Sequence, residues 1–302
     1  MKNKNIKRRL VLYALIICII GVGLFSLYSI YEKKYDKPDR SGNTKMTMAD
    51  KIEGKVEAEL LDLNLIGDFN KEDGLVINDN RGIPVIGYHS IGSDSTGTSP
   101  LVISPEKFRK HLKTLADRGY TTLTLKQVED YLLNDEPIPA KSVLLTFDDG
   151  YEDNYTNMFP ILKEFKMNAV IFVIPTYLDS GEYLKRSQVK EMSDYGIDIE
   201  SHTYTHKRLG DLPYEEQLKE LTLSKKAVND ITGKDVTSIA YPEGIYNEDT
   251  IKAVKEAGYK MGFTIKRGYA DRDDDIFELN RVCVDHTYEG KNLLYVLKGI
   301  EK

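Results

Sequence analysis

From Arg81 to the C-terminus, short apolar runs alternate with longer amphipathic stretches, and this alternation most constrains how the chain can fold. Strands are expected over residues 83–89, 142–148, 168–174, 197–202, 236–241, 260–265 and 279–284. Helices are expected over residues 104–120, 154–166, 186–196, 213–233 and 247–259, with Ser104, Ser187 and Asn247 as candidate caps. Such alternation predicts a mostly parallel sheet covered by helices. We expect a closed or nearly closed (β/α) barrel, with an open doubly wound sheet as the alternative.

A second feature lies at the N-terminus, where residues 10–30 form an apolar run without a charged side chain. At about 1.5 Å per residue, such a run spans a hydrocarbon core of about 30 Å. Basic residues concentrate before it, at Lys2, Lys4, Lys7, Arg8 and Arg9. This pattern predicts that residues 1–9 stay in the cytoplasm and that the rest is exported. We expect a single-pass membrane anchor and an extracellular domain, with a cleaved signal peptide or a lipid attached at Cys18 as alternatives.

The segment over residues 31–80 is rich in Lys, Asp, Glu, Asn and Gly. It predicts a stalk between the anchor and a folded domain over residues 81–302, with one helix within it over residues 48–66. The formal net charge of −6 gives no reason to expect nucleic acid as a partner. Cys18 and Cys283 fall in the anchor and in an expected strand, so we predict no disulfide between them.

The first polar cluster is the sequence Thr-Phe-Asp-Asp-Gly at 146–150, which ends an expected strand. In a (β/α) barrel, side chains at the C-terminal ends of the strands form the active site. Two adjacent carboxylates, here Asp148 and Asp149, repel each other unless a positive group lies beside them. Taken alone, the sequence fits an Asp-Gly turn with helix-capping carboxylates better than it fits a catalytic site.

The second cluster follows the strand expected over residues 197–202 and contains His202 and His206. The spacing of four residues predicts that both rings lie on one side of a helical turn. Imidazole nitrogen is a preferred ligand of zinc and similar ions. Together with the acidic pair at another strand end, the two histidines favour a metal site over a chance arrangement.

The sequences at 146–150 and Ser-His-Thr-Tyr-Thr-His at 201–206 closely resemble two motifs of the polysaccharide deacetylase family, the nodulation-deacetylase-like carbohydrate esterases of family four. The resemblance covers residues 83–284 and implies a deformed (β/α)7 barrel. It implies that Asp148 is the general base and that Asp149, His202 and His206 bind a divalent metal, with zinc expected. Such a ligand set leaves a position for water and substrate, and the neighbouring carboxylate can accept the proton of that water.

The sequence Ala-Tyr-Pro-Glu-Gly at 240–244 is similar to the third motif of the family, which is commonly Arg-x-Pro-Tyr. Ala240 replaces the arginine and Glu243 replaces the tyrosine. The resemblance still implies a main-chain N–H donor to the oxyanion at Glu243, although a plain Pro-Gly turn fits equally well. Arg281 resembles the arginine in a Leu-Pro-Arg strand of some members. It either replaces the missing arginine in holding Asp148 or forms a salt bridge at the rim.

The general acid of the family is commonly a histidine near the C-terminus, where this chain has His286 in a poorly fitting context. The first expected strand instead ends in Gly-Tyr-His-Ser at 87–90 and resembles the circularly permuted branch that includes the poly-N-acetylglucosamine deacetylases. In that branch the strand that carries the acid opens the domain, which implies His89 rather than His286. His111, in an expected helix between Lys110 and Lys113, is predicted to lie at the surface.

The resemblance implies a metal-dependent N-deacetylase that releases acetate from N-acetylglucosamine units of a cell-envelope polysaccharide, either peptidoglycan or poly-N-acetylglucosamine. An O-acetyl esterase acting on an acetylated glycan would use the same metal ligands. A glycan-binding surface module without activity is the third hypothesis. Tyr151, Tyr204 and Tyr241 each flank a motif and are candidate platforms for sugar rings, with core or rim packing as an equal alternative. The sequence does not indicate a protein partner.

Overall fold

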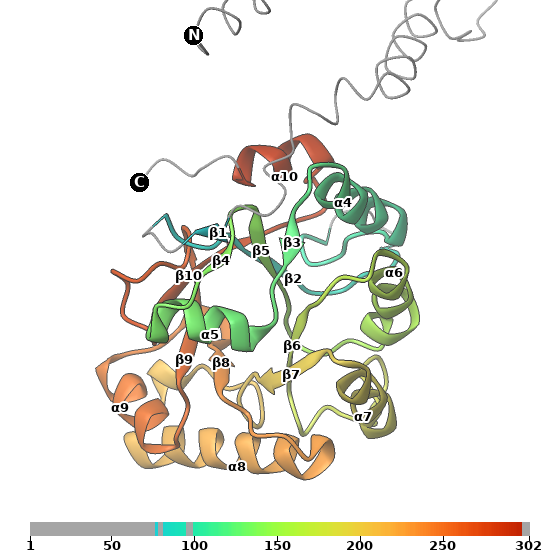
Figure 1. Cartoon of the computed structure of the whole chain (residues 1–302). Coiled ribbons are helices and arrows are strands. Elements are labelled where there is room, and N and C mark those ends of the chain that lie inside the picture. The colour runs from blue at the N-terminus through green and yellow to red at the C-terminus, as the bar shows by residue number, and fades with distance from the viewer. Residues whose placement is uncertain (1–75, 78–80, 95–98, 298–302) are drawn as a thin grey trace, which may run out of the picture. The chain divides into compact units, whose positions relative to one another are not determined.

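The computed structural model describes residues 76–77, 81–94 and 99–297 (Figure 1). The expected anchor, most of the expected stalk with its helix, and Cys18 lie outside these residues. Among the residues described, no helix combines the length and apolar composition that a membrane crossing requires. Strand β1 (Val76–Ile77) falls in the segment expected as a stalk, and it pairs with β4 (Ile138–Pro139). Two residues of that segment therefore contribute to the sheet structure of the domain.

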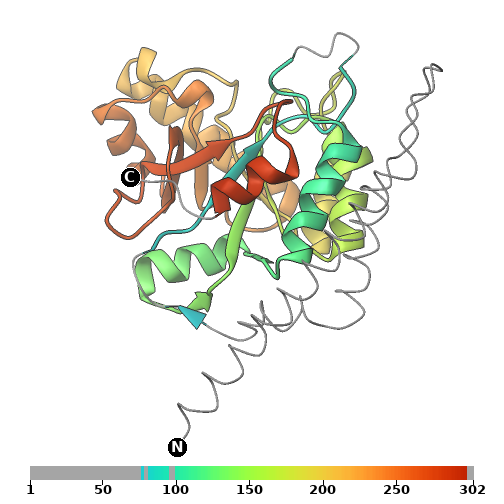
Figure 2. The ribbon, with the colours of Figure 1, turned by 90° about the horizontal axis from the view of Figure 1, so that it is seen from above.

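A closed ring of parallel strands forms the centre of the described domain (Figures 1 and 2). In ring order the strands are β2 (Val85–Tyr88), β10 (Leu279–Cys283), β9 (Met261–Arg267), β8 (Ser238–Ala240), β7 (Asp198–Ser201), β6 (Val170–Val173) and β5 (Ser142–Phe147). The pairing of β2 with β5 closes the ring, with Val85 opposite Leu144. A short further strand, β3 (Thr121–Thr122), pairs with the start of β5 outside the ring. The predicted (β/α)7 barrel is confirmed, and the open doubly wound sheet is wrong.

Helices cover the outside of the barrel (Figure 1). They are α4 (Pro105–Asp117), α6 (Phe159–Phe165), α7 (Arg186–Tyr195), α8 (Tyr214–Thr232), α9 (Glu248–Glu256) and α10 (Gly290–Leu297). The predicted caps Ser104 and Asn247 accept main-chain N–H groups at the starts of α4 and α9. Ser187 is not a cap, because α7 begins at Arg186 and Ser187 already lies in its first turn. Helix α10 was not predicted from the sequence.

The two-residue period of each strand divides its side chains between the barrel interior and the layer beneath the helices. In β5, Leu144 belongs to the interior cluster, whereas Val143 and Leu145 belong to the cluster under the helices. The interior is filled by side chains from several strands, among them Phe172 and Phe263, whose ring centroids lie 5.6 Å apart. The barrel is therefore a packed core and not a channel.

Helix α5 (Leu125–Asn134), which the sequence did not predict, covers one end of this interior. Its apolar face packs in the same cluster as the inward side chains of the strands. The N–H of Leu125 donates to Asp198 Oδ2 at 2.8 Å, and Lys260 Nζ lies 2.8 Å from Glu129 Oε1. Asp198 and Lys260 lie at the N-terminal ends of β7 and β9. Helix α5 thus seals the N-terminal end of the barrel, opposite the strand ends that carry the sequence motifs.

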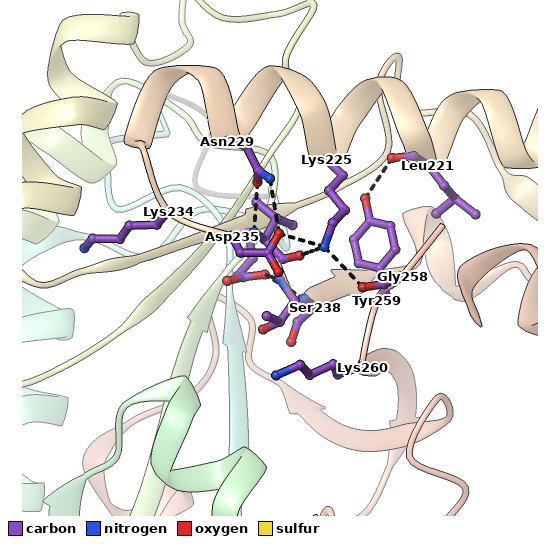
Figure 3. Close-up of polar contacts among 12 residues, drawn as sticks. Leu221, Lys225, Asn229, Lys234, Asp235, Ser238, Gly258, Tyr259 and Lys260 are labelled. Carbon is purple, nitrogen blue, oxygen red and sulfur yellow. Dashed lines mark hydrogen bonds and ion pairs between the residues drawn. The ribbon is translucent and has the colours of Figure 1, made fainter. Parts of the chain in front are cut away.

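Side chains of α8 hold the N-terminal ends of two further strands. Figure 3 shows Lys225 and Asn229 directed toward the segment that leads into β8. Lys225 Nζ donates to the main-chain oxygens of Val236 and Gly258, the latter at 3.1 Å. Asn229 Oδ1 accepts the N–H of Val236 at 2.9 Å. These contacts fix the C-terminal half of α8 to the starts of β8 and β9, so its N-terminal half reaches the motif-bearing end of the barrel.

A buried carboxyl in β7 predicts a pH-dependent stability. Burial raises the pKa of Glu200 well above its usual range, although the N–H groups of Thr237 and Ser238 donate to its Oε2 at 2.9 and 2.7 Å. In the unfolded chain the pKa of glutamate is about 4.3. The folded state therefore keeps the Glu200 proton to a higher pH, and it loses stability as the pH rises through the folded pKa. Glu200→Gln keeps an oxygen acceptor without the charge. We expect urea unfolding to show a larger advantage of E200Q over wild type at pH 8 than at pH 5. An equal difference at the two pH values would contradict the raised pKa.

Candidate active site

Polar side chains occupy the barrel interior at the C-terminal ends of the strands. Continuing the inward series of β5 through Thr146 leads to Asp148, and continuing that of β2 through Gly87 leads to His89. The same period places Arg281 of β10 inside the ring, where it is fully buried. Strand geometry alone therefore brings a carboxylate, an imidazole and a guanidinium to one end of the barrel.

Asp149, His202 and His206 come together at this end. The Nε2 atoms of His202 and His206 lie 3.4 and 3.3 Å from Oδ1 of Asp149, and one possible ligand atom from each residue lies within 4.8 Å of the others. His202 Nδ1 is 2.8 Å from the main-chain oxygen of Ala240, so Nδ1 carries a proton and Nε2, which faces Asp149, is the nitrogen that can bind a metal. Ligand atoms about 2.1 Å from a tetrahedral ion are themselves about 3.4 Å apart. The donor set and its spacing fit a divalent cation.

The two histidines converge through strained main chain and not through the predicted helical turn. Residues 202–206 form an irregular segment after β7. In the ranges that the structure covers, seven residues other than glycine have φ in the left-handed region, and four lie at this site: Asp149 (71°), Thr203 (61°), His206 (61°) and Glu243 (54°). This conformation is particularly unfavourable for a β-branched residue such as Thr203. Strain of this kind costs of order 1–3 kcal/mol per residue and concentrates at functional sites.

Glu220 of α8 holds the segment between the two histidines. Its Oε2 accepts the N–H of Thr205 and its Oε1 accepts the Thr205 hydroxyl, each at 2.8 Å. The Glu220 side chain is buried in the described domain. The sequence analysis did not identify this residue, although one signal was present. Glu220 lies on the buried face of α8 between Gln217 and Leu221, where an unpaired carboxylate would be costly.

Asp148 forms a buried, two-point ion pair with Arg281. Arg281 Nη1 donates to Asp148 Oδ1 and Nη2 donates to Oδ2, each at 2.8 Å, while Nε donates to the main-chain oxygen of Thr264 at 2.8 Å. Burial would raise the pKa of Asp148, but the guanidinium outweighs it and holds that pKa below its usual range. Asp148 is therefore ionised and fixed in orientation. Arg281 lies inside the barrel rather than at its rim.

Arg281→Met is expected to destabilise the fold by about 3–5 kcal/mol, because it leaves the buried Asp148 carboxylate without a partner. Urea unfolding measures the loss. Adding Asp148→Asn removes the unpaired charge and is expected to restore most of the stability. The matched control is Arg186→Met at the exposed pair with Asp179, which should change stability by less than about 1 kcal/mol. A double variant no more stable than R281M would show that the charge is not the cause.

The structure separates the two candidate acids. Burial lowers the pKa of His89, against the opposing effect of the nearby Asp148 and Asp149 carboxylates. His286 follows β10, and its main-chain oxygen accepts the Lys107 ammonium of α4 at 2.5 Å. His89 thus lies among the charges of the site, whereas His286 lies beside α4.

His111 is not a surface residue, contrary to the prediction. Its ring is fully buried, with Nδ1 3.1 Å from the Tyr88 hydroxyl and Nε2 3.1 Å from the main-chain oxygen of Tyr288. Successive residues of an α-helix point about 100° apart. Lys110 and Lys113 therefore reach solvent while His111 occupies the buried face of α4. It joins the outer side of β2 to the C-terminal segment.

The third motif lies in the turn η3 (Pro242–Gly244), directly after β8. This turn is joined to the metal-ligand group through the contact of Ala240 with His202. The Glu243 side chain is 61% exposed and lies 3.9 Å from Arg208 Nη1. A solvent-directed side chain fits a role of the Glu243 main chain rather than of its carboxylate.

Aromatic rings flank the metal-ligand group on one side. Tyr151 stacks on Tyr183 with centroids 5.3 Å apart, and Tyr177 lies 4.8 Å from Tyr183 and 6.4 Å from the His206 ring. All three tyrosines are partly exposed. Tyr241 is fully buried, so core packing and not sugar binding accounts for it. Tyr177 and Tyr183 were missed in the sequence because they belong to no motif.

Comparison with known proteins relates these features to a family. A family model described as Polysaccharide deacetylase matches residues 135–262. The protein YxkH of Bacillus subtilis is 41% identical over 208 residues, which span 69% of this chain and 73% of YxkH. The chain belongs to the polysaccharide deacetylase family. The predicted family membership is thereby confirmed.

Two other relatives extend the comparison. The Streptococcus pyogenes deacetylase PplD, solved in complex with acetate, is 31% identical with a TM-score of 0.70, and the match covers 72% of this chain and 99% of that chain. The poly-beta-1,6-N-acetyl-D-glucosamine N-deacetylase of Staphylococcus epidermidis is 27% identical over 235 residues, or 72% of this chain and 81% of the relative. This polysaccharide deacetylase is therefore a hydrolase, as the motifs predict.

Proposed function

We propose that this polysaccharide deacetylase removes N-acetyl groups from N-acetylglucosamine units of a cell-envelope polymer and releases acetate. The observation that carries the proposal is the convergence of Asp149, His202 and His206, with ligand atoms within 4.8 Å of one another, next to the buried pair of Asp148 and Arg281. A divalent cation held by these three residues, expected to be zinc, supplies Lewis-acid chemistry that polarises an acetyl carbonyl and lowers the pKa of water.

Three other groups act in the proton transfers and in stabilising the oxyanion. Asp148 acts as the general base: Arg281 keeps it ionised and oriented, and each carboxylate oxygen retains a lone pair for the proton of the attacking water. The Glu243 N–H is the proposed donor to the tetrahedral oxyanion. His89 protonates the departing amine. Amide hydrolysis needs such an acid because an unprotonated amine leaves poorly.

The choice of substrate rests on the relatives and on the three tyrosines beside the metal-ligand group. The Staphylococcus epidermidis relative is named for poly-beta-1,6-N-acetyl-D-glucosamine, and PplD was solved with acetate, the product that deacetylation releases. Tyr151, Tyr177 and Tyr183 offer partly exposed ring faces beside the metal ligands, which suits the apolar faces of sugar rings. Each deacetylated unit carries a cationic amine, so the reaction makes the polymer more positive.

We infer that residues 10–30 anchor the chain in the cell membrane with residues 31–75 as a spacer and the catalytic domain outside the cell. The uncharged apolar run and the basic residues before it support this placement. A polymer substrate of the envelope lies on the same side of the membrane.

The test uses the full chain supplied with Zn²⁺ and incubated separately with poly-N-acetylglucosamine and with peptidoglycan, while acetate and free amine are measured. Release from either polymer supports the proposal and identifies the substrate. Acetate release from O-acetylated xylan alone would replace it with an O-acetyl esterase. Glycan binding without acetate release from any polymer would indicate a module without activity.

A further inference from the structure

The segment that carries His89 is held by a turn that the proposed chemistry does not use. This turn, η1 (Asn154–Met158), has π-helical hydrogen bonding and starts five residues after Asp149. Turns of this type are rare and often occur at functional sites. Side chains of the turn and of Asp153, the residue before it, point to the loop that follows β2. The loop comprises His89, Ser90 and Ile91.

Four hydrogen bonds join the turn to three consecutive residues of that loop. Asn154 Nδ2 donates to the main-chain oxygen of His89 at 2.9 Å. Asp153 Oδ2 accepts the Ser90 hydroxyl at 2.5 Å, and its Oδ1 accepts the Ile91 N–H at 3.0 Å. Asn157 Nδ2 donates to the main-chain oxygen of Ile91 at 2.8 Å. We call Asp153, Asn154 and Asn157 the loop clamp.

The clamp is tightly packed against the loop. Asn154 is fully buried and Ser90 is 8% exposed. A Cβ atom added to Gly92 would lie 2.6 Å from Asp153 Oδ2, so a side chain at position 92 would displace the Asp153 carboxylate. Because the clamp belongs to the segment that begins with Asp148 and Asp149, it ties the main chain of His89 to the carboxylates of the site.

The His89 ring itself has little to orient it. Its Nδ1 is buried and has no hydrogen-bond partner within the described residues. Metal-site and catalytic histidines are usually oriented by a hydrogen bond from the second ring nitrogen. In the absence of such a bond at Nδ1, the direction of the ring depends on how its main chain is held.

We propose that Asp153, Asn154 and Asn157 are positioning residues that aim His89 at the departing amine. This inference rests on the proposed function, in which His89 is the general acid. The π-helical turn and the residue before it place the three side chains against the loop. A misplacement of about 1 Å can cost about 100-fold in rate, so the effect is measurable without direct contact with the substrate.

The test is Asn154→Asp, which keeps the volume but sets a carboxylate against the His89 carbonyl instead of a donor. It is assayed on an N-acetylglucosamine oligomer and on 4-nitrophenyl acetate, whose phenolate leaves without protonation. We expect kcat on the amide to fall about 10- to 100-fold and kcat on the ester to change less than about 3-fold. Asn157→Asp, at a half-buried position, should also lower kcat on the amide more than kcat on the ester, with a smaller difference. It replaces N154D in the test if N154D does not fold.

The matched control is Asn168→Asp, because Asn168 Nδ2 donates a similar hydrogen bond to the main-chain oxygen of Thr122 at 2.9 Å. Asn168 precedes the N-terminal end of β6, away from the motif-bearing ends of the strands. N168D should leave both activities unchanged. Zinc affinity, measured against a chromophoric chelator, should equal that of wild type in all three variants. Unchanged amide hydrolysis in N154D and N157D, or equal losses on amide and ester, would overturn the clamp.

Two further measurements separate the clamp from the function on which it rests. If wild type releases no acetate from any amide substrate, the proposed deacetylation fails. If His89→Ala keeps the amide activity of wild type, the acid role of His89 fails, and the clamp fails with it. A large amide-selective loss in H89A combined with normal amide activity in N154D and N157D would reject the clamp alone.

Discussion

Asp149→Asn is expected to reduce deacetylation to below detection. Asparagine tolerates the left-handed φ of 71° at this position, so the main chain stays in place while a neutral amide replaces the anionic ligand. Loss of a residue that merely orients a ligand already costs about 10- to 100-fold in metal affinity, and loss of the carboxylate ligand should cost more. Acetate release and zinc affinity are measured on the same preparation. Chelator treatment of wild type should cause the same loss of activity, and added Zn²⁺ should reverse it.

The control for D149N is Asp179→Asn. Asp179 also has a left-handed φ, of 67°, but it forms an exposed ion pair with Arg186. This variant should keep wild-type activity and zinc affinity. Zinc should also raise the Tm of wild type and of D179N, since a ligand that binds only the folded state stabilises it, but not that of D149N. Undiminished activity of chelator-treated wild type would contradict the metal site.

Asp148→Asn should lower kcat by about 10²- to 10⁴-fold, the usual contribution of a general base. The asparagine oxygen can still accept one bond from Arg281, but the side chain can no longer take a proton from water. Zinc affinity should remain near that of wild type, because the three ligands are unchanged. This combination distinguishes loss of the base from loss of the metal. Turnover measured from acetate release, together with zinc content, provides the test.

The control for D148N is Asp198→Asn at the opposite end of the barrel, where a partly buried aspartate accepts the N–H of Leu125 at 2.8 Å. This exchange also replaces an aspartate with asparagine, without touching the motif-bearing strand ends. It should alter stability but not kcat. If D148N and D198N had equal turnover, Asp148 would not be the base.

Much of the fold could be predicted because it follows from local periods. Apolar runs of strand length separated by amphipathic stretches identified each strand of the ring to within a few residues. Helix α5 escaped prediction although its sequence has a capping box at Thr124 and Gln127 and apolar residues at helical spacing. The turn η1 falls within the helix expected over residues 154–166, and only its π-helical form was not predicted. The ten residues of α5 become a stable helix by covering the barrel interior, which the sequence does not display.

The contacts within the site could also be predicted only in part. The motifs predicted that Asp149, His202 and His206 would meet, and the structure brings their ligand atoms together. The main-chain conformation between the two histidines was predicted wrongly. Their spacing suggested a helical turn, whereas residues with left-handed φ bring the two rings together. His111 was also misjudged, because its charged neighbours were given more weight than its place on the helix.

By itself, the sequence determined the strands of the ring, most of the helices outside it and the family to which the chain belongs, since these depend on residues close together in the chain. Only the tertiary structure decided that Arg281 enters the barrel to bind Asp148, that Glu220 supports the histidine segment, and that η1 holds the loop of His89. Arg281 and Asp148 are 133 residues apart, and they meet because β2 pairs with both β5 and β10 and so closes the ring. A contact across a closed ring depends on every strand between its partners, and no local period encodes it.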